Sequence, residues 1–292
     1  MELGRLLTAM VTPFDTDLNV DYKAAERLVQ HLVDTGTQGI VVSGTTGESP
    51  TLTTAEKLEL FRVVKRAAAG KAAVVAGTGN YCTAESIELS REAEQIGVDA
   101  VMLVAPYYNK PSQEGLYQHF KAIAGSIGIP VVLYNVPTRT VTNIEPQTII
   151  RLAEIPNIAA VKEASKNMEA AAEIRGATPE SFLIYSGDDG VTLPIMSVGG
   201  HGIISVAGHL AGAMIRQMVD KFAAADTAGA LALHLKLMPL FKAIFVTTNP
   251  VPVKYALNRM GIPVGGVRLP LVEASEKEKG VVDAALQGLG LI

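Results

Sequence analysis

The sequence contains one cysteine, no tryptophan and no long apolar run. With Cys82 alone, no disulfide can form within the chain, which is usual for proteins of a reducing compartment. No stretch approaches the roughly 18 uninterrupted apolar residues that a membrane-spanning helix needs. The opening MELGRLLTAMVTPF lacks the basic start and long apolar core of a secretory signal. We therefore expect a cytoplasmic protein without a membrane partner.

Clustered positive charge is also missing. Lysine and arginine together number 25 against 29 aspartates and glutamates, which gives a formal net charge of −4. Nucleic acid is not an expected partner, because phosphate binding needs clustered Lys and Arg. Hydrophobic residues make up 48% of the chain and charged residues 18%, so a large core can form and a disordered chain is excluded.

Short apolar segments alternate with amphipathic stretches that end in glycine. The apolar segments are eight in number, at 6–14, 39–44, 72–79, 100–106, 130–137, 158–165, 182–189 and 202–208. Strands this uniformly apolar are usually covered on both faces, as in parallel sheets. Eight strand–helix alternations predict an α/β fold, a (β/α)8 TIM barrel. The alternative is an open doubly wound sheet, but GTGN (77–80) lacks the third glycine of a dinucleotide-binding loop.

The strand pattern stops after residue 208. Four helices are predicted beyond it, at 209–225, 227–246, 250–260 and 273–288. The first completes the barrel, so we predict a barrel over 1–225 and a C-terminal helical extension over 226–292. No linker separates the two parts, and we expect the extension to pack on the barrel.

A lysine interrupts one of the apolar segments, IAAVKEAS (158–165). Strand alternation places Ile158, Ala160, Lys162 and Ala164 on one face. If that face is inward, Lys162 projects into the barrel mouth, where active sites of this fold lie. Apolar surroundings disfavour the ammonium form, and a neutral amine can attack a ketone to form an imine. Tyr134, in the preceding segment, is a candidate proton carrier.

Structural interpretations of the same residues stay open. Lys162 can be a solvated strand end or half of an ion pair with Glu163, and Tyr134 can be a core residue. GTTGES (44–49) can simply cap the following helix. His201 and His209 flank the last strand, but no His, Asp or Glu cluster has clear metal-ligand spacing, so we predict no metal.

Five motifs occur together at the predicted strand ends. They are GTTGES (44–49), APYYNKP (105–111), YNVPTRT (134–140), AAVKEAS (159–165) and YSGDD (185–189). In this order they resemble the Schiff-base class I aldolases and lyases related to N-acetylneuraminate lyase, and within them the dihydrodipicolinate synthase family. The resemblance covers nearly the whole chain. It implies a lyase that condenses pyruvate with L-aspartate 4-semialdehyde in lysine and diaminopimelate biosynthesis, without an external cofactor.

The resemblance also implies roles for four catalytic residues. Lys162 matches the lysine that forms the pyruvate imine, and Tyr134 matches the proton shuttle. Thr45 matches the hydroxyl that relays protons with it. Tyr108 matches a tyrosine that completes this relay from the neighbouring subunit of a dimer. The resemblance therefore implies a homo-oligomer, and we expect a homotetramer.

Four further positions match substrate-binding residues. Thr46 matches a residue that binds the pyruvate carboxylate, and Arg139 matches the cation that receives the aldehyde's carboxylate. Gly187 and Ile204 match backbone positions that line the pyruvate pocket. Hydroxyls and backbone N–H groups suit a small carboxylate, and an arginine fork suits bidentate binding.

Three other functions compete with this interpretation. A sister aldolase acting on a sialic acid or a 2-keto-3-deoxy sugar acid would share Lys162 and Tyr134, but a sugar chain needs hydroxyl partners more than the cation of Arg139. A catalytically silent anion-binding barrel has no reason to keep lysine, tyrosine and threonine together. A phosphate-binding isomerase would show glycine-rich loops after strands 7 and 8, whereas SVGGHG (197–202) precedes strand 8.

Inhibition by L-lysine is common among the relatives implied by the resemblance, in a cleft at the dimer interface. Ser49, Glu85 and Tyr107 match that cleft. The departures are Thr54 and Lys57, where inhibited relatives often carry a ring, and Tyr81, where they often carry asparagine. If Lys57 faces the cleft, its ammonium occupies the place of the effector's charge; otherwise it lies on a solvated helix face. Either way, we expect little or no inhibition.

Overall fold

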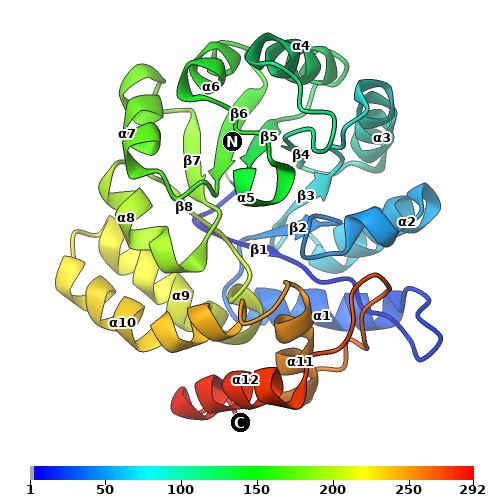
Figure 1. The fold of residues 1–292 in the computed structure, drawn as a ribbon, viewed down its shortest axis with the longest axis vertical. Coiled ribbons are helices and arrows are strands. Elements are labelled where there is room, and N and C mark those ends of the chain that lie inside the picture. The colour runs from blue at the N-terminus through cyan, green and yellow to red at the C-terminus, as the bar shows by residue number, and fades with distance from the viewer. Residues whose placement is uncertain (1–2) are drawn as a thin grey trace.

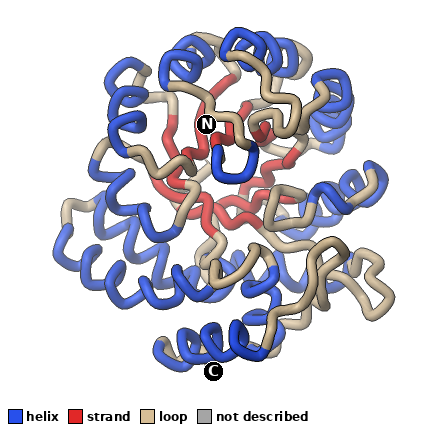
Figure 2. Tube along the Cα trace, viewed as in Figure 1, coloured by secondary structure: helices blue, strands red, loops and turns tan. Residues whose placement is uncertain are grey.

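The chain forms a closed barrel of parallel strands, described for residues 3–292 in a computed structural model. Each strand pairs with the next in the chain, and the last pairs with the first. The strands are β1 (Leu6–Ala9), β2 (Gly39–Val42), β3 (Ala73–Gly77), β4 (Ala100–Val104), β5 (Val131–Asn135), β6 (Ile158–Glu163), β7 (Leu183–Ser186) and β8 (Gly202–Ser205). Figure 1 shows helices around this ring, and Figure 2 shows the strands in red at its centre. The predicted TIM barrel is confirmed.

The helices begin at the caps that the sequence offers. In the second helix, Thr53 and Glu56 form a reciprocal capping box, and in the first, Asp21 accepts a hydrogen bond from the backbone N–H of Ala24. The helices around the barrel are α1 (Tyr22–Asp34), α2 (Thr54–Ala68), α3 (Thr83–Ile96), α4 (Gln113–Ala124), α5 (Pro137–Thr140), α6 (Pro146–Ala153), α7 (Met168–Ala177), α8 (Thr192–Ser197) and α9 (Gly208–Ala223), with 3₁₀ turns η1 (Ser49–Thr51) and η2 (Asp189–Val191). None in residues 3–292 is long and apolar enough to cross a membrane.

Two layers of side chains form the core. One fills the barrel, with Leu7, Val41 and Ile204 among its members, and the other lies between the strands and the surrounding helices. Ile158 belongs to the outer layer, so its predicted place on the face of Lys162 is wrong. The pairing of β5 with β6 shifts register there, because Val131 pairs with Ile158 but Val132 pairs with Ala160.

All eight predicted strands form, but each ends earlier than its apolar segment. The segment 39–44 ends as β2 at Val42, and 158–165 ends as β6 at Glu163. The remaining residues of each segment lie in the loops and short turns that follow the strand, or begin the next helix. These loops form the mouth of the barrel, where the candidate site lies.

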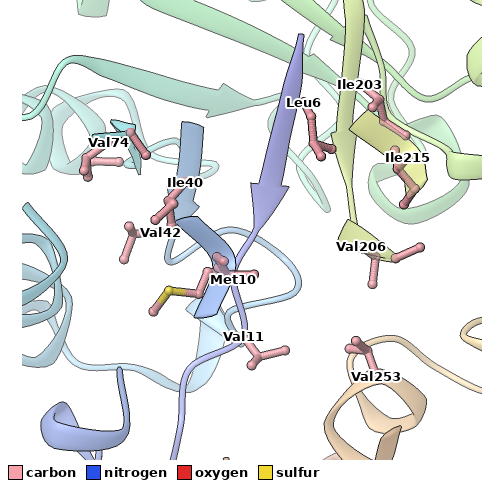
Figure 3. Close-up of a cluster of buried hydrophobic side chains, with 14 of the residues drawn as sticks. Leu6, Met10, Val11, Ile40, Val42, Val74, Ile203, Val206, Ile215 and Val253 are labelled. Atoms are coloured by element: carbon pink, nitrogen blue, oxygen red, sulfur yellow. The ribbon is translucent and has the colours of Figure 1, made fainter. Parts of the chain in front are cut away.

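The C-terminal extension folds into three helices against the barrel. They are α10 (Thr227–Ala243), α11 (Val251–Arg259) and α12 (Glu276–Gly288), close to the predicted bounds. Both α10 and α11 pack on α9, and α12 packs on α10 and α11 (Figure 1). In Figure 3, Val253 of α11 faces Val206, which follows β8. The division of the chain at 225/226 into barrel and extension stays a prediction.

Candidate active site

Lys162 lies inside the barrel, near the C-terminal end of β6. Lys162 is only 4% exposed, so it is not a solvated strand end. Its Cα pairs in register with that of Tyr134 in the adjacent strand, β5. The Nζ atom lies 4.3 Å from the centroid of the Tyr134 ring, within the range of a cation–π contact.

Glu163 does not neutralise this lysine. Successive strand residues face opposite sides, so the Glu163 carboxylate points away from the barrel interior. It accepts a hydrogen bond of 3.0 Å from Asn135 Nδ2 and another from the backbone N–H of Ser165. Within residues 3–292, no carboxylate forms an ion pair with Lys162. The ion-pair alternative that the sequence leaves open is therefore removed.

Gly187 provides the space in which the lysine side chain lies. A Cβ at this position would lie 3.2 Å from Lys162 Cε and 2.7 Å from the Ala164 Cβ. The Gly187 N–H donates a hydrogen bond of 2.7 Å to the Glu163 carbonyl, which fixes the turn after β7 against β6. A larger residue at 187 would displace the amine that the site presents.

A cavity of about 570 Å³ opens over Lys162 at the mouth of the barrel. Five of the other predicted site residues line it, namely Thr45, Thr46, Tyr134, Arg139 and Gly187. The opposite wall comes from the C-terminal extension, with Met238, Phe241, Lys242, Phe245 and Asn249. The sequence gives no signal for this second wall, because the contact depends on how α10 lies across the barrel.

A second cavity, of about 230 Å³, adjoins the first. Thr45, Tyr134, Val136 and Arg139 line both cavities, and Tyr107 lines the second. Among residues 3–292, no hydrogen bond joins the hydroxyls of Thr45 and Tyr134 directly. Both hydroxyls nevertheless border the same space, so a bound molecule or a water can connect them.

Thr46 is held by the extension. Thr46 is only 3% exposed, and its Oγ1 accepts a hydrogen bond of 2.9 Å from Asn249 Nδ2. Because the oxygen accepts from Asn249, the hydroxyl proton is free to donate to an anion in the cavity. Asn249 Oδ1 is buried and accepts no hydrogen bond from any of residues 3–292. The motif GTTGES pointed to Thr46, but nothing in the segment TTNP (247–250) marked Asn249 as its neighbour.

Two predicted residues lie outside both cavities. Tyr108 is 94% exposed, so its ring projects into solvent. Its φ of +72° is a backbone conformation that residues other than glycine rarely adopt. Ile204 is buried in the inner layer of the barrel and does not line either cavity. The neighbouring Tyr107 lines the second cavity and packs edge-on against Tyr81, with ring centroids 5.1 Å apart.

Several charged groups surround the first cavity. Lys166 and Asp188 form an ion pair of 2.8 Å at its edge, and the exposed Arg139 and Lys242 also line it. Asp188 stands in the quoted motif YSGDD, so strand-end reasoning could have found it. Its neighbour Asp189 is buried, and burial raises the pKa of Asp189 to about 6, although hydrogen bonds from Ser205, Val206 and Ala207 act in the opposite direction.

The histidines beside β8 are not arranged as metal ligands. His209 is fully buried, and its Nε2 accepts a hydrogen bond of 3.1 Å from the backbone N–H of Val11. Its Nδ1 then donates 2.8 Å to the Val206 carbonyl. In the described part of the chain, no three His, Cys, Asp or Glu side chains gather as a possible metal site.

Comparison with known proteins gives consistent results over the full chain. A relative from Moorella thermoacetica is 59% identical over 292 residues, covering 100% of both chains, and is named 4-hydroxy-tetrahydrodipicolinate synthase. A relative of the same name from Bacillus subtilis is 54% identical, covering 96% of this chain and 97% of its own. A solved dihydrodipicolinate synthase from Cyanidioschyzon merolae with lysine bound superimposes with a TM-score of 0.98, at 47% identity and 99% coverage of both chains.

The family assignment rests on almost every residue of the chain. Residues 2–289 match the Dihydrodipicolinate synthetase family. The matched region includes the eight strands, the five strand-end motifs and the three helices of the extension. The chain belongs to the Dihydrodipicolinate synthetase family.

Proposed function

We propose that this chain condenses pyruvate with L-aspartate 4-semialdehyde to give 4-hydroxy-tetrahydrodipicolinate, an early step of lysine and diaminopimelate biosynthesis. The observation that carries the proposal is the position of Lys162. It is buried against Tyr134, forms no ion pair with a carboxylate of residues 3–292, and lies beneath a cavity that Thr45, Thr46 and Arg139 help to line. Relatives that are 59% and 54% identical carry the name of this synthase, so the sister-aldolase alternative is not favoured.

Lys162 acts as the nucleophile. Its amine adds to the pyruvate ketone, and loss of water leaves an imine between the lysine nitrogen and the substrate carbon. The Thr46 hydroxyl donates a hydrogen bond to the pyruvate carboxylate, because its oxygen already accepts one from Asn249. Gly187 and Ile204 shape the space around the bound pyruvate, Gly187 at the cavity wall and Ile204 in the layer beneath.

The imine then makes the pyruvate methyl acidic. Loss of a methyl proton gives an enamine, whose carbon attacks the aldehyde of the second substrate. The aldehyde oxygen takes a proton from Tyr134. Two other hydroxyls pass protons to and from this phenol, that of Thr45 in the same chain and that of Tyr108 in a second subunit. Arg139 holds the aldehyde's carboxylate at the cavity mouth. Finally the substrate's own amine displaces Lys162, which closes the ring and regenerates the enzyme.

The reaction consumes no external cofactor, and none of these steps needs a metal. We propose that the chain forms dimers in which Tyr108 acts in a partner's site, which its almost complete exposure supports. We also propose that these dimers assemble into a homotetramer, as the family resemblance implies. We also propose that the enzyme works in the cytoplasm, which fits its single cysteine.

The decisive experiment pairs trapping with a substrate comparison. Borohydride is added with pyruvate, and the labelled peptide is mapped by mass spectrometry; a reduced three-carbon adduct on Lys162 is expected. Condensation is then assayed with aspartate semialdehyde, and cleavage with N-acetylneuraminate and a 2-keto-3-deoxy sugar acid. Faster turnover of either sugar acid would overturn the proposed substrate.

A further inference from the structure

The loop that carries Thr45 and Thr46 is tied to the C-terminal extension by a buried ion pair. Glu48, three residues after Thr45, is 1% exposed through its side chain, and Lys254 of α11 is 2% exposed. Their charged atoms, Glu48 Oε1 and Lys254 Nζ, lie 2.8 Å apart. The two residues are 206 positions apart in the sequence.

Both charges of this pair are fully satisfied. The second oxygen of Glu48 accepts a hydrogen bond of 3.0 Å from the backbone N–H of Arg268. Lys254 also donates to the Gly266 carbonyl, and its Nζ lies 4.0 Å from the centroid of the Phe14 ring. Burial lowers the pKa of Lys254 to about 8, against the effect of Glu48.

Arg268 extends the same network to the far end of the loop. Its guanidinium donates 2.8 Å to the Thr51 carbonyl and contacts Glu56 at 2.6 Å. This contact, more than any other, lowers the pKa of Glu56 to about 2. Since Glu56 also caps α2, Arg268 joins the end of the loop and the start of the helix to the extension.

The loop needs such support because its backbone is strained. Ser43 and Glu48 both have a φ of +55°, in the left-handed region that residues other than glycine rarely adopt. Non-glycine residues persist in such conformations only when the surrounding structure holds them there. Three residues of the extension hold this loop. Asn249 contacts Thr46, Lys254 contacts Glu48, and Arg268 contacts both Glu48 and Thr51.

Stability alone does not account for the pair. A buried ion pair commonly contributes little net stability, because desolvation of both charges offsets their attraction. A hydrophobic pair of similar volume would hold the extension on the barrel equally well. The ion pair adds a contact of fixed length and direction between α11 and the loop. This loop carries Thr45 and Thr46, which line the same cavity as Lys162.

We propose that Glu48 and Lys254 are positioning residues, which hold the Thr45–Thr46 loop in the geometry needed for pyruvate binding and proton transfer. The C-terminal extension is thereby part of the active site. The inference rests on the proposed function for its kinetic consequences, but its structural consequence, a loop fixed by this pair, does not depend on which substrate the site accepts.

The test uses variants that remove the pair without leaving a buried charge. Glu48→Gln/Lys254→Met removes both charges at similar volume, while the glutamine side chain keeps an amide oxygen for the Arg268 N–H. Arg259→Met/Asp283→Asn is the matched control, because it removes a 3.1 Å ion pair that joins the same helix, α11, to α12. Each protein is assayed as the full chain for kcat, for the KM of pyruvate and for hydrogen exchange of the peptide covering 43–52.

We expect the first double variant to melt within a few degrees of the wild type. Its kcat/KM for pyruvate should fall by at least about tenfold, the equivalent of roughly 1.4 kcal/mol, with KM raised and kcat lowered together. Peptide 43–52 should exchange faster than in the wild type. The control should leave all three measurements unchanged. Kinetics within twofold of the wild type, with unchanged exchange, would show that the pair is only structural and overturn the inference.

A second variant decides the matter if the first fails to fold. Glu48→Gln keeps the volume of the side chain and an amide oxygen for the Arg268 N–H, and removes the negative charge that pairs with Lys254. It should raise the KM of pyruvate and the exchange of peptide 43–52, and no change in either would contradict the inference. If the wild type itself forms no pyruvate adduct, the proposed function fails, while the exchange measurement still decides the role of the pair.

Discussion

Lys162 and Tyr134 are register partners in adjacent strands, and the lysine Nζ lies 4.3 Å from the centroid of the tyrosine ring. A nucleophile and a phenol are thus fixed side by side by the main chain of the barrel, on β6 and β5. The ring borders the amine and also lines the two cavities above it. The group that attacks and the group that transfers protons therefore need no loop movement to meet.

Lys162→Ala should abolish turnover and leave the fold intact. Loss of the amine removes imine formation, whereas no ion pair among residues 3–292 is lost with this side chain. Borohydride trapping with pyruvate and a melting curve measure the two effects. Lys166→Ala, at the edge of the same cavity, is the control and should still form the adduct. An adduct on any lysine other than Lys162 would rule out this mechanism.

Arg139→Ala should separate the two substrates. Imine formation with pyruvate should stay close to the wild type, because Arg139 lies at the exposed mouth of the cavity. The KM of the aldehyde should rise, since a charge-assisted hydrogen bond contributes roughly 1.5–3 kcal/mol. Steady-state kinetics with each substrate varied in turn measure this, with Arg151→Ala on α6 as the control. An equal loss for both substrates would contradict the assignment.

Strand-end residues could be predicted because the barrel itself determines where they meet. Eight parallel strands bring their C-terminal ends to one mouth, so Thr45, Tyr134, Lys162 and Gly187 were placed together by topology. Simple alternation failed at Ile158, where a register shift with β5 moves the side chain to the outer layer. Such a shift depends on pairing between strands and leaves no mark on the pattern of one strand.

The contribution of the extension could not be predicted. Lys254 and Glu48 are 206 residues apart, and Asn249 and Thr46 are 203 apart. A lysine in a helical pattern such as VPVKYALNR is typical of a solvated face, and only the packing of α11 on the barrel buries it. Polar contacts of this kind need the tertiary fold, because neither partner carries a local signal for the other.

Tyr108 should act in the site of a neighbouring subunit. Tyr108→Phe and Lys162→Ala are each expected to be nearly inactive alone. Mixed after separate purification and exchange, they should recover about one quarter of the wild-type activity, because half of randomly mixed dimers are mixed and one of their two sites is complete. Native mass spectrometry verifies the mixed dimers. Verified mixed dimers without activity would place the whole relay within one chain.

Stability should fall as the pH is lowered, partly through His209. Burial lowers the pKa of His209 to about 4, whereas the unfolded chain protonates near pH 6.5. The folded state therefore binds fewer protons than the unfolded state in this window, and stability is lost as the pH falls through it. The shift corresponds to roughly 3 kcal/mol. Burial also lowers the pKa of His119 to about 4, so His119 likewise makes stability fall as the pH is lowered. Burial raises the pKa of Asp189, so Asp189 has the opposite effect on stability.

His209→Gln isolates this contribution, because it keeps polar atoms near Val11 and Val206 and removes the titration. Urea unfolding should show the variant to be less stable than the wild type at about pH 7, with the difference shrinking towards about pH 4.5. The other titrating groups are common to both proteins and cancel in the comparison. A difference that stays constant with pH would show that His209 does not titrate as its burial implies.

L-Lysine should inhibit this enzyme weakly. Lys57 lines a cavity of about 350 Å³ that also contains Ser49, Glu85 and Tyr107, so it does not lie on a solvated helix face. Burial lowers the pKa of Lys57, while the Glu85 carboxylate acts in the opposite direction. Two like charges about 4 Å apart repel by about 4 kcal/mol at an effective dielectric near 20, enough to offset weak binding of a cationic amino acid.

A steady-state assay at saturating pyruvate checks this expectation. Wild-type half-inhibition should need more than about 1 mM L-lysine, a concentration equivalent to about 4 kcal/mol of binding. Lys57→Ala should become more sensitive, because it removes the competing ammonium while Glu85 remains in the cavity to attract the effector. Lys65→Ala is the matched control on the same helix, since Lys65 is paired with Asp99 at 2.7 Å and does not line this cavity. Half-inhibition of the wild type below about 1 mM, or equal sensitivity of the two variants, would show that Lys57 does not exclude the effector.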